Sequence, residues 1–483
     1  YKDSDSGDSP LPRRHGVGID RTTGAASDGA LYEHEFLPRG TKFDIRITAE
    51  GRDGEQKNDM ERKDNKQSDG IPGPAPSDTV KKLLEFIVDV LTSGAVCLGG
   101  RTGSGQGTIQ VIKPKLRRTG KTTDAGTLTA PADVLDALIG EDEEGTPIPL
   151  ELGGWTLEDP ARITIDWWSP TGIFVAEDEK LTKQRKAAKE AENREKGINE
   201  EVHEVVYPLR DPSVAWDEAQ LLIPGTSIRG ALRSRASRIA RTFLAARGDA
   251  VPFASHDIHE QIAAEPNLVR YMFGSTEYRG ALTVHDCLST DRGKLIEVTH
   301  NAIDRWTGGV IDGGLFTEAV YLGTHWEPIT IDIDLRRLLK NIEAEKGPED
   351  REQSKPTHAD YAHAAYVLLG LVLAELSAGT LPLGSRSTRG LGQVVVTTIE
   401  IEGADREGVD LPSWNFTGCE ALQQPATGAG VMTDTLYEGQ CKLAEQVLKH
   451  LKDKYKETDW SKRLENGTRA ARKQSEGTGA ADD

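Results

Sequence analysis

The stretch LLIPGTSIRGALRSRASRIARTFLAAR, residues 221–247, decides the fold because a short apolar run and a Pro-Gly turn lead into a long amphipathic pattern. The pattern predicts a helix, and Thr226 or Ser227 stands where the N-cap of that helix would be. Apolar residues recur at helical spacing and predict the buried stripe of the helix: Ile228, Leu232, Ile239 and Phe243.

Arginines occupy a neighbouring face of the same predicted helix, and no acidic residue interrupts the stretch. A helix N-terminus carries free backbone N–H groups and a partial positive charge, which together attract a phosphate. The turn residues Thr226 and Ser227, with Arg229 and Arg233 beside them, are therefore predicted to bind a phosphate group. The alternative is an ordinary amphipathic helix whose arginine face is solvated.

Composition limits the classes of protein to which the chain can belong. Its 483 residues are enough for two or more domains. With 59 Lys and Arg against 78 Asp and Glu, the formal net charge of -19 argues against a protein that coats nucleic acid indiscriminately, although a local basic groove remains compatible with it. Many of the acids fall in charge-rich stretches that we interpret as insertions: 53–69, 141–144, 177–204 and 343–352.

Cysteine spacing and hydropathy indicate the compartment. The cysteines are Cys97, Cys287, Cys419 and Cys441, and their wide separation favours a reduced cytoplasm over a zinc site or a disulfide framework. The longest largely apolar run, 366–376, is too short to span a bilayer, and we expect no membrane association. The first Met is at position 60, so we expect the native start to lie upstream of residue 1.

Two distant segments share one order of residues, in which an Asp-Arg loop lies between a strand-like run and an alternating strand. The shared residues are Asp20, Arg21, Thr23 and Gly24 in the first segment and, 284 positions later (304 against 20), Asp304, Arg305, Thr307 and Gly308 in the second. Chance does not easily supply so many matches at one offset. We interpret them as an internal duplication.

A glycine-rich loop repeats as well, each time after a predicted helix, at 80–91 and at 361–376. Its shared residues are Gly99, Arg101, Gly105 and Gly107 and, 285 positions later (384 against 99), Gly384, Arg386, Gly390 and Gly392. The repeated loop extends the duplication to whole modules, of which the first lacks its front half and begins only at its Asp-Arg loop.

The duplication predicts four parts of the chain. They are the C-terminal part of a first module at 1–118, a linker at 119–157, a second module at 158–402, and at 403–483 a C-terminal helix near 436–455 followed by a disordered tail.

With both copies in view, the chain resembles the repeat-associated mysterious protein (RAMP) superfamily, specifically the backbone subunits of type III CRISPR effector complexes. The residues that carry the resemblance are IPGTSIRGALRSRA at 223–236, IDR-x-TG at 19–24 and 303–308, and the glycine loops at 99–107 and 384–392. The resemblance covers roughly residues 15–118 and 160–402. Two modules on one chain are similar to the fused backbone proteins of type III-D and III-E systems.

The resemblance implies an α+β chain of two tandem ferredoxin-like (RRM-like) RAMP modules, each with a β-hairpin thumb. The thumb residues would be Asp20, Arg21, Thr23, Asp304, Arg305, Trp306 and Thr307. Such subunits bind guide (cr)RNA in an antiviral ribonucleoprotein complex, and their thumbs displace bases at regular intervals so that target RNA can pair. The implied partners are guide RNA, target RNA and other effector subunits.

The residue chemistry fits a single RNA strand as ligand, because glycine loops let the main chain approach a sugar-phosphate and arginines meet the phosphates. The expected RNA-binding residues are Thr226, Ser227, Arg229, Arg233, Gly99, Gly100, Arg101, Gly384, Ser385, Arg386, Arg389 and Gly390. A flexible turn at 99–107 is the structural alternative. A nucleotide-binding P-loop at 119–122 fails because Lys115 stands where its first glycine is needed.

Catalysis is left open by the sequence. The resemblance implies a carboxylate upstream of the IPG turn and Mg²⁺ or Mn²⁺ for cleavage of target RNA, but the family's Asp falls at Val205 or Val206. Glu204 and Asp211 are the candidate substitutes, and solvated loop carboxylates are the alternative. A guide-processing RAMP endonuclease is a further alternative function.

Two aromatic side chains near the second Asp-Arg loop allow two interpretations each. His300 is either an acid or base or, more in keeping with a lone histidine, a structural residue. Trp306 either stacks on a displaced base or packs in a core.

Overall fold

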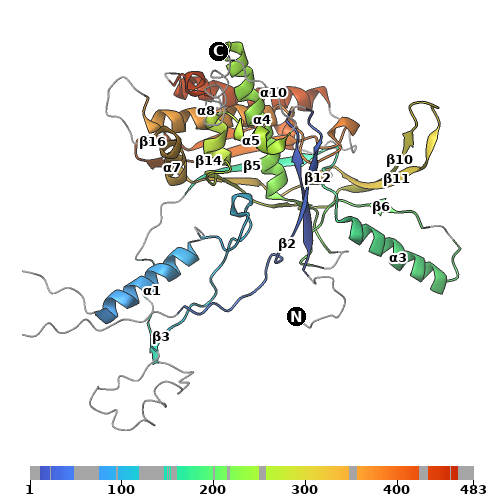
Figure 1. Ribbon diagram of the computed structural model, residues 1–483, viewed down its shortest axis with the longest axis horizontal. Helices are drawn as coiled ribbons and strands as arrows, with labels where there is room; N and C mark the ends of the chain where they lie inside the picture. The colour runs from blue at the N-terminus through green and yellow to red at the C-terminus, as the bar shows by residue number, and fades with distance from the viewer. Residues whose placement is uncertain are drawn as a thin grey trace, which may run out of the picture. The chain divides into compact units, whose positions relative to one another are not determined.

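The computed structural model shows an α+β protein (Figure 1). The residues that it describes are 11–21, 23–47, 76–93, 96–118, 146–149, 151, 153, 160–199, 202–214, 218–249, 257–347, 356–423, 433–456 and 458–465. Internal contacts divide the chain into two compact units. One comprises Tyr1–Thr41, Gly103–Gln106 and Asp159–Asp483, and the other comprises Lys42–Thr102 and Gly107–Glu158.

An antiparallel sheet with the strand order β17-β14-β5-β13-β8 forms the centre of the first unit. Its strands are β5 (Ala161–Ser169), β8 (Leu282–Val284), β13 (Ile329–Ile333), β14 (Val395–Glu402) and β17 (Trp414–Thr417), and β12 (Thr324–His325) pairs with the end of β5. With the helices α4 (Gly225–Ala246) and α8 (His358–Ser377), the chain order β5-α4-β8-β13-α8-β14 is the β-α-β-β-α-β order of ferredoxin-like folds. The predicted α+β class is confirmed.

The core lies between this sheet and its helices. In β5 the alternating residues Ala161, Ile163 and Ile165 are fully buried, which the period of two in the sequence predicts. The helix α8 begins with a capping box between Thr357 and Asp360, and most of its side chains are buried. It is long and apolar enough to cross a membrane, but its environment here is the protein core.

The helix α4 differs in two details from the helix predicted for residues 221–247. Its N-cap is Pro224, without a side-chain cap, instead of Thr226 or Ser227. The first free N–H, that of Gly225, donates to Asp286 Oδ1 at 2.8 Å, so the cap comes from another segment. The buried stripe repeats every four residues through Ile228, Leu232, Ala236, Ala240 and Leu244, whereas Phe243 is 42% exposed and packs edge-on against Trp460.

Two β-hairpins belong to the same unit, β1 (Arg13–Ile19) with β2 (Ala26–Glu35) and β10 (Lys294–Ile303) with β11 (Val310–Leu322). Their register is the same after the offset of 284: Ile19 faces Ala26 as Ile303 faces Val310, and both pairs adjoin a bulge. In each tip the backbone N–H of the Asp donates to the carbonyl oxygen of the residue five positions later. The N–O distance is 2.9 Å for Asp20 and 2.8 Å for Asp304. The repeated sequence therefore forms a repeated structure.

The first unit also contains shorter strands and further helices. They are α3 (Glu179–Glu195), β6 (Val205–Val206), β7 (Leu222–Ile223), α5 (Ile258–Ala263), α6 (Asn267–Phe273), β9 (Cys287–Leu288), α7 (Leu335–Lys346), η3 (Ser387–Arg389), β15 (Ala404–Arg406), β16 (Val409–Leu411), α9 (Glu420–Gln423), α10 (Asp434–Lys454) and η4 (Trp460–Arg463). The helix α10 lies where the C-terminal helix is predicted, and it packs on α8. The predicted tail at 466–483 and most of the predicted linker lie outside the described residues.

The second unit contains α1 (Pro76–Thr92) and the strand pair β3 (Leu116–Arg118) and β4 (Thr146–Ile148). The first glycine loop follows α1 and includes the short helix η2 (Thr102–Ser104). A backbone hydrogen bond closes this loop, in which Leu98 N–H donates to the Gly107 carbonyl oxygen at 2.8 Å. The second loop is closed by the corresponding bond, from Leu383 N–H to the Gly392 carbonyl oxygen at 2.9 Å. Arg101 and Arg386 both adopt a left-handed conformation, with φ of 56° and 66°. The loops share their backbone as well as their sequence.

Candidate nucleic-acid interface

The second glycine loop is held rigidly by its own backbone. At Gly392, φ is +89° and a Cβ atom would lie 2.5 Å from the Leu383 carbonyl oxygen, so only glycine fits. The backbone N–H and the hydroxyl of Ser385 both donate to the Phe174 carbonyl, at 2.7 and 2.8 Å. Ser385, which the sequence assigns to RNA, thus uses its hydrogen atoms within the protein. Gly384 and Gly390 supply two further positive-φ positions.

Two arginines of this loop converge on one buried carboxylate. Glu318 on β11 is 1% exposed, and it accepts hydrogen bonds from Arg386 Nε at 2.7 Å and from Arg389 Nη1 at 3.1 Å. The side chains of Arg386 and Arg389 remain 36% and 41% exposed. Since two cations share one anion, the cluster keeps a net positive charge, and its partly exposed guanidinium groups have further donors that suit an anion.

Aromatic rings also contact the same two arginines. The guanidinium carbon of Arg386 lies 5.6 Å from the centre of the Phe174 ring, and that of Arg389 lies 5.2 Å from the Phe316 ring. His300 stacks on Phe316 and places its Nε2 3.4 Å from Glu318. His300 therefore belongs to the support of this cluster, which agrees with its structural interpretation.

The candidate catalytic carboxylates lie in separate surroundings. Glu204 immediately precedes β6, and the Asp211 side chain accepts hydrogen bonds from the Ser213 N–H and hydroxyl within its own turn, at 2.9 and 2.8 Å. In the parallel pairing of β6 with β11, Val206 lies opposite Glu318. No group of three or more His, Cys, Asp or Glu side chains that could hold a metal ion occurs in the described part of the chain. The use of Mg²⁺ or Mn²⁺ and a catalytic role for Glu204 or Asp211 both stay predictions.

The N-terminus of α4 is occupied by protein groups. Asp286, which accepts the Gly225 N–H, also pairs with Arg14 Nη1 at 2.8 Å. The segment Gly103–Gln106 of the first glycine loop packs beside it, since a Cβ atom on Gly225 would lie 2.8 Å from the Ser104 carbonyl oxygen. A carboxylate thus takes the position that the sequence assigns to a phosphate. Thr226 and Ser227 are only partly buried in the first turn of α4, and their assignment to RNA stays a prediction.

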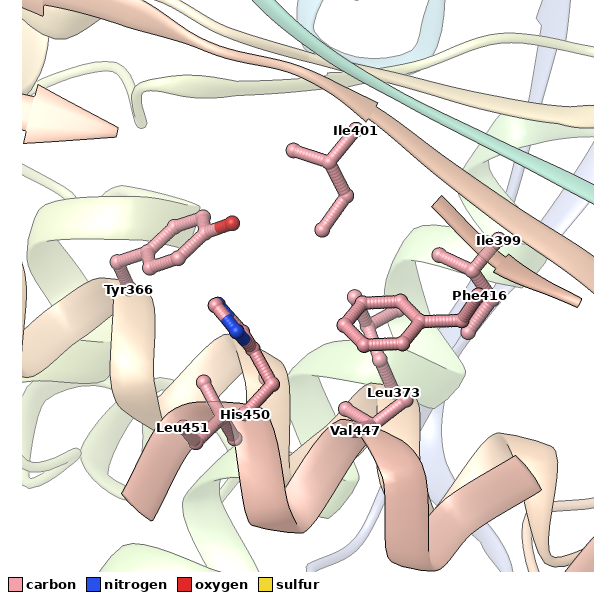
Figure 2. Close-up of a pocket in the computed structure, with 9 residues that line it drawn as sticks. Tyr366, Leu373, Ile399, Ile401, Phe416, Val447, His450 and Leu451 are labelled. Atoms are coloured by element: carbon pink, nitrogen blue, oxygen red, sulfur yellow. The ribbon is translucent and has the colours of Figure 1, made fainter. Parts of the chain in front are cut away.

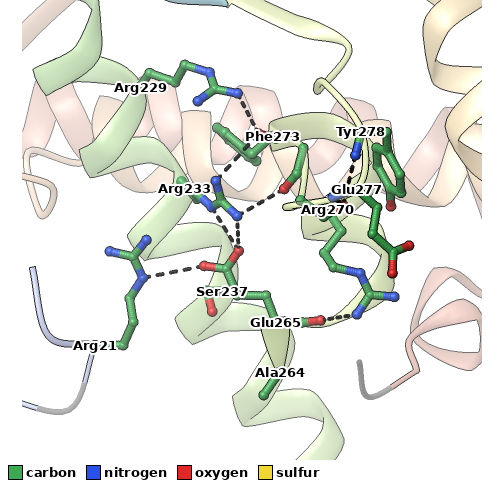
Figure 3. A network of polar contacts seen from close by, with 12 residues as sticks. Arg21, Arg229, Arg233, Ser237, Ala264, Glu265, Arg270, Phe273, Glu277 and Tyr278 are labelled. Atoms are coloured by element: carbon green, nitrogen blue, oxygen red, sulfur yellow. Dashed lines mark hydrogen bonds and ion pairs between the residues drawn. The ribbon is translucent and has the colours of Figure 1, made fainter. Parts of the chain in front are cut away.

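The arginines of α4 take part in a buried network (Figure 3). Glu265 is 0% exposed and accepts a hydrogen bond from Arg233 Nε at 2.8 Å, while Arg229 donates to the Phe273 carbonyl oxygen. Burial lowers the pKa of Arg229 to about 10, and the neighbouring charge of Arg233 contributes to the lowering. Binding of RNA by Arg229 and Arg233 stays a prediction, and the contacts that the structure gives them are internal.

The tip of the first hairpin reaches into the same network. Arg21 Nε donates to Glu265 at 3.4 Å, and the Arg21 backbone N–H donates to the side-chain oxygen of Gln261 at 2.8 Å. Burial lowers the pKa of Arg21, whereas the charge of Glu265 opposes that shift. Asp20 is 6% exposed and accepts the Thr23 N–H at 3.1 Å, so Asp20 and Arg21 are packed in protein, whereas Thr23 and Gly24 at the turn are exposed.

The tip of the second hairpin has the same internal bonds but points into solvent. Asp304 accepts the N–H groups of Thr307 and Trp306, each at 2.8 Å, and these bonds lower the pKa of Asp304. Trp306 is 96% exposed, which excludes its packing in the core of the described chain. Arg305 is also exposed.

The first glycine loop presents an open surface at its start. Gly99 has φ of +87°, and a Cβ atom added to Gly99 or to Gly100 would meet no other described atom within 4 Å. Arg101, in its left-handed conformation, takes part in further interactions. The assignment of Gly99, Gly100 and Arg101 to RNA stays a prediction.

An apolar pocket between β14, α8 and α10 is no alternative site (Figure 2). Its volume is about 10 Å³, which is room for roughly one water and too little for a ligand. It is lined by core residues such as Tyr366, Ile399 and Leu451, and burial lowers the pKa of His450 at its edge.

The sequence analysis did not predict the two buried acids, Glu318 and Glu265, on which the arginines converge. Glu318 carries a signal, because it lies on the apolar face of an alternating strand with Phe316 and Val320, where an acid needs a partner. Glu265 lies in a loop before α6, and nothing in its sequence context indicates burial.

Comparison with protein families gives one match. Residues 221–395 match the family model of the RAMP superfamily, and a search of curated proteins found no match for the chain. The matched segment runs from β7 to the first residue of β14, so it includes α4, the hairpin β10–β11, Glu318 and the second glycine loop. It indicates a CRISPR-associated role in RNA binding in general. The match supports membership of the RAMP superfamily, carried by residues 221–395.

Proposed function

We propose that this protein is a backbone subunit of a type III CRISPR effector complex that binds guide RNA along its sugar-phosphate backbone. The observation that carries the proposal is the cluster of Arg386 and Arg389 on the buried Glu318, at the base of an exposed hairpin within the RAMP-matched segment. The fused, two-module form is supported by the repeated hairpin and the repeated glycine loop, and it points to a III-D or III-E type of system.

The cluster suits a phosphate because its charges are preorganised. Glu318 and the rings of Phe174 and Phe316 restrict the two guanidinium groups before any ligand arrives, so less side-chain entropy is lost on binding. An RNA strand also needs room, and the adjoining hairpin offers an exposed apolar edge at Leu315 that suits the displacement of a base. The exposed hairpin is the part of the chain that the resemblance identifies as a thumb.

The test is the affinity of the chain for a single-stranded RNA over a series of salt concentrations. Arg386→Ala with Arg389→Ala is expected to weaken binding similarly for all sequences, and to reduce the salt slope by about 0.7 for each phosphate that is no longer neutralised. The matched control is Arg336→Ala with Lys340→Ala on α7, which removes the same charge from exposed positions. Equal losses in both double variants would mean that binding follows net charge alone and would refute the site.

Cleavage of guide-paired target RNA is the alternative activity, and guide processing is a weaker one. Either would yield 2′,3′-cyclic ends when a 2′-hydroxyl attacks its own phosphate. Glu204→Ala should abolish such products if Glu204 acts, and it should leave them unchanged if the scaffold function alone is present with another subunit cutting. A cytoplasmic location and other effector subunits as partners belong to the same proposal.

A further inference from the structure

His300 is a titratable side chain beside Glu318 to which the proposed phosphate site assigns no role. It lies on β10 opposite Phe316, and its Nε2 is 3.4 Å from Glu318 Oε2. Its ring stacks on Phe316 with 5.1 Å between the ring centres, and its side chain is 28% exposed. The neighbours therefore hold the imidazole in place, while its partial exposure lets it exchange a proton with solvent.

The charged groups gathered around His300 come from two elements. Glu318 on β11 is the acid, and Arg386 and Arg389 of the second glycine loop are the two cations that it binds. The guanidinium carbon of Arg389 also lies 5.2 Å from the centre of the Phe316 ring, on which His300 stacks. The strands on either side of β11 place uncharged side chains directly opposite Glu318: Val298 on β10 and Val206 on β6.

A proton on His300 changes how the charge of Glu318 is shared. With a neutral His300 the cluster carries two arginines and one glutamate, a net charge of +1, and a proton on His300 raises it to +2. The protonated imidazole also competes for the carboxylate, so Glu318 attracts each guanidinium group less strongly. Both changes favour an external anion at the arginines.

We infer that His300 is a positioning residue of the phosphate site and that its protonation, acting through Glu318, strengthens the binding of an RNA phosphate by Arg386 and Arg389. The inference rests on the proposed function for the identity of the ligand. Because linkage is reciprocal, a bound phosphate must in turn favour the protonated imidazole. Guide binding therefore tightens as the pH falls through the range in which histidine titrates.

The experiment measures the affinity of the chain for oligo(U) at about pH 8 and at about pH 6, at one salt concentration. Uracil has no group that titrates in this range, so the protein alone changes its charge. The wild type is expected to bind at least about threefold more tightly at the lower pH, the order of effect of one added charge near a surface site. His300→Gln should lose most of this increase. His300→Arg carries its charge at both pH values, so it should bind more tightly than His300→Gln at both and show no increase.

His325 offers the matched control because it also has a carboxylate and an aromatic ring beside it. Its Nδ1 is 2.6 Å from Asp291, and its ring centre is 6.0 Å from that of Trp168. His325→Gln should keep the pH dependence of the wild type, since His325 belongs to a different cluster.

A second measurement needs no RNA. Nuclear magnetic resonance of selectively labelled histidine follows the titration of the His300 ring in the wild type and in the Arg386→Ala, Arg389→Ala double variant. Removal of two cations favours the protonated ring, so the midpoint of this titration should move to higher pH in the variant.

Four results would overturn the inference. They are equal affinity of the wild type at both pH values, an undiminished increase in His300→Gln, an equal loss of the increase in His325→Gln, and a His300 titration that is the same in the double variant. If the chain bound no oligo(U) at either pH, the proposed function would fail and the inference with it. Binding that does not depend on pH would overturn the inference alone.

Discussion

The hairpins β1–β2 and β10–β11 have the same register, the same bulge and the same hydrogen-bonded loop, yet Arg21 of the first tip is packed in protein whereas Arg305 and Trp306 of the second are exposed. Arg21 donates to the buried Glu265, while its counterpart Arg305 has no hydrogen bond or ion pair to a described residue. Local sequence thus determines the conformation of the loop. The surroundings determine whether that loop supports the fold or is free to bind a partner.

The two arginine clusters differ in the same way. Around Glu265 the side chains of Arg21 and Arg233 are 11% and 14% exposed, and they serve the fold. Around Glu318 the arginines Arg386 and Arg389 are more than a third exposed. One acid with two arginines is therefore a structural device in the first case and a candidate phosphate site in the second.

The largest expected effect comes from removal of the buried acid at the first tip. Glu265→Ala leaves Arg21 and Arg233 without their shared anion, and it should lower the free energy of unfolding by about 3–5 kcal/mol. Urea denaturation measures the change. Arg305→Ala is the matched control at the second tip and should stay within about 0.5 kcal/mol of the wild type. Equal losses in the two variants would remove the distinction between the hairpins.

A second comparison uses two glycines of one loop. Gly392→Ala brings a Cβ atom against the Leu383 carbonyl, and it should cost at least about 2 kcal/mol in stability. Gly390 also has positive φ, but no atom lies within 4 Å of its Cβ position, so Gly390→Ala should cost only about 1 kcal/mol. Thermal unfolding of both variants distinguishes them. A larger loss for Gly390→Ala would contradict the rigid-loop description.

The smallest expected effect is a local response of the second tip to acid. The N–H groups of Thr307 and Trp306 stabilise the ionised Asp304, so its pKa lies below the ordinary value of 3.8. Because the pKa of Asp304 is lowered in the folded protein, ionised Asp304 stabilises the tip above pH 3.8. This stabilisation is lost as the pH falls through the pKa of Asp304 in the folded protein. The amide resonance of Trp306 should shift in that range. In Asp304→Asn the titration should disappear, and its persistence there would assign it to another group.

Much of this architecture could be predicted from the sequence because it depends on local patterns. The alternation in β5, the apolar run of α8 and the positive-φ glycines of both loops follow from residues close together in the chain. The role of Glu265 could not be predicted, because its partners Arg21 and Arg233 lie 244 and 32 residues away. For the same reason, the cap of α4 by Asp286 escaped a prediction based on Thr226 and Ser227.

The central claim is that the arginines of the second glycine loop bind the sugar-phosphate backbone of an RNA strand. The most direct measurement is photochemical cross-linking of the chain to a single-stranded RNA that carries 4-thiouridine, followed by mass spectrometry of the peptides. We predict cross-links in the peptide that contains residues 384–392, and their loss in the Arg386→Ala and Arg389→Ala double variant. Cross-links that avoid this peptide would contradict the claim.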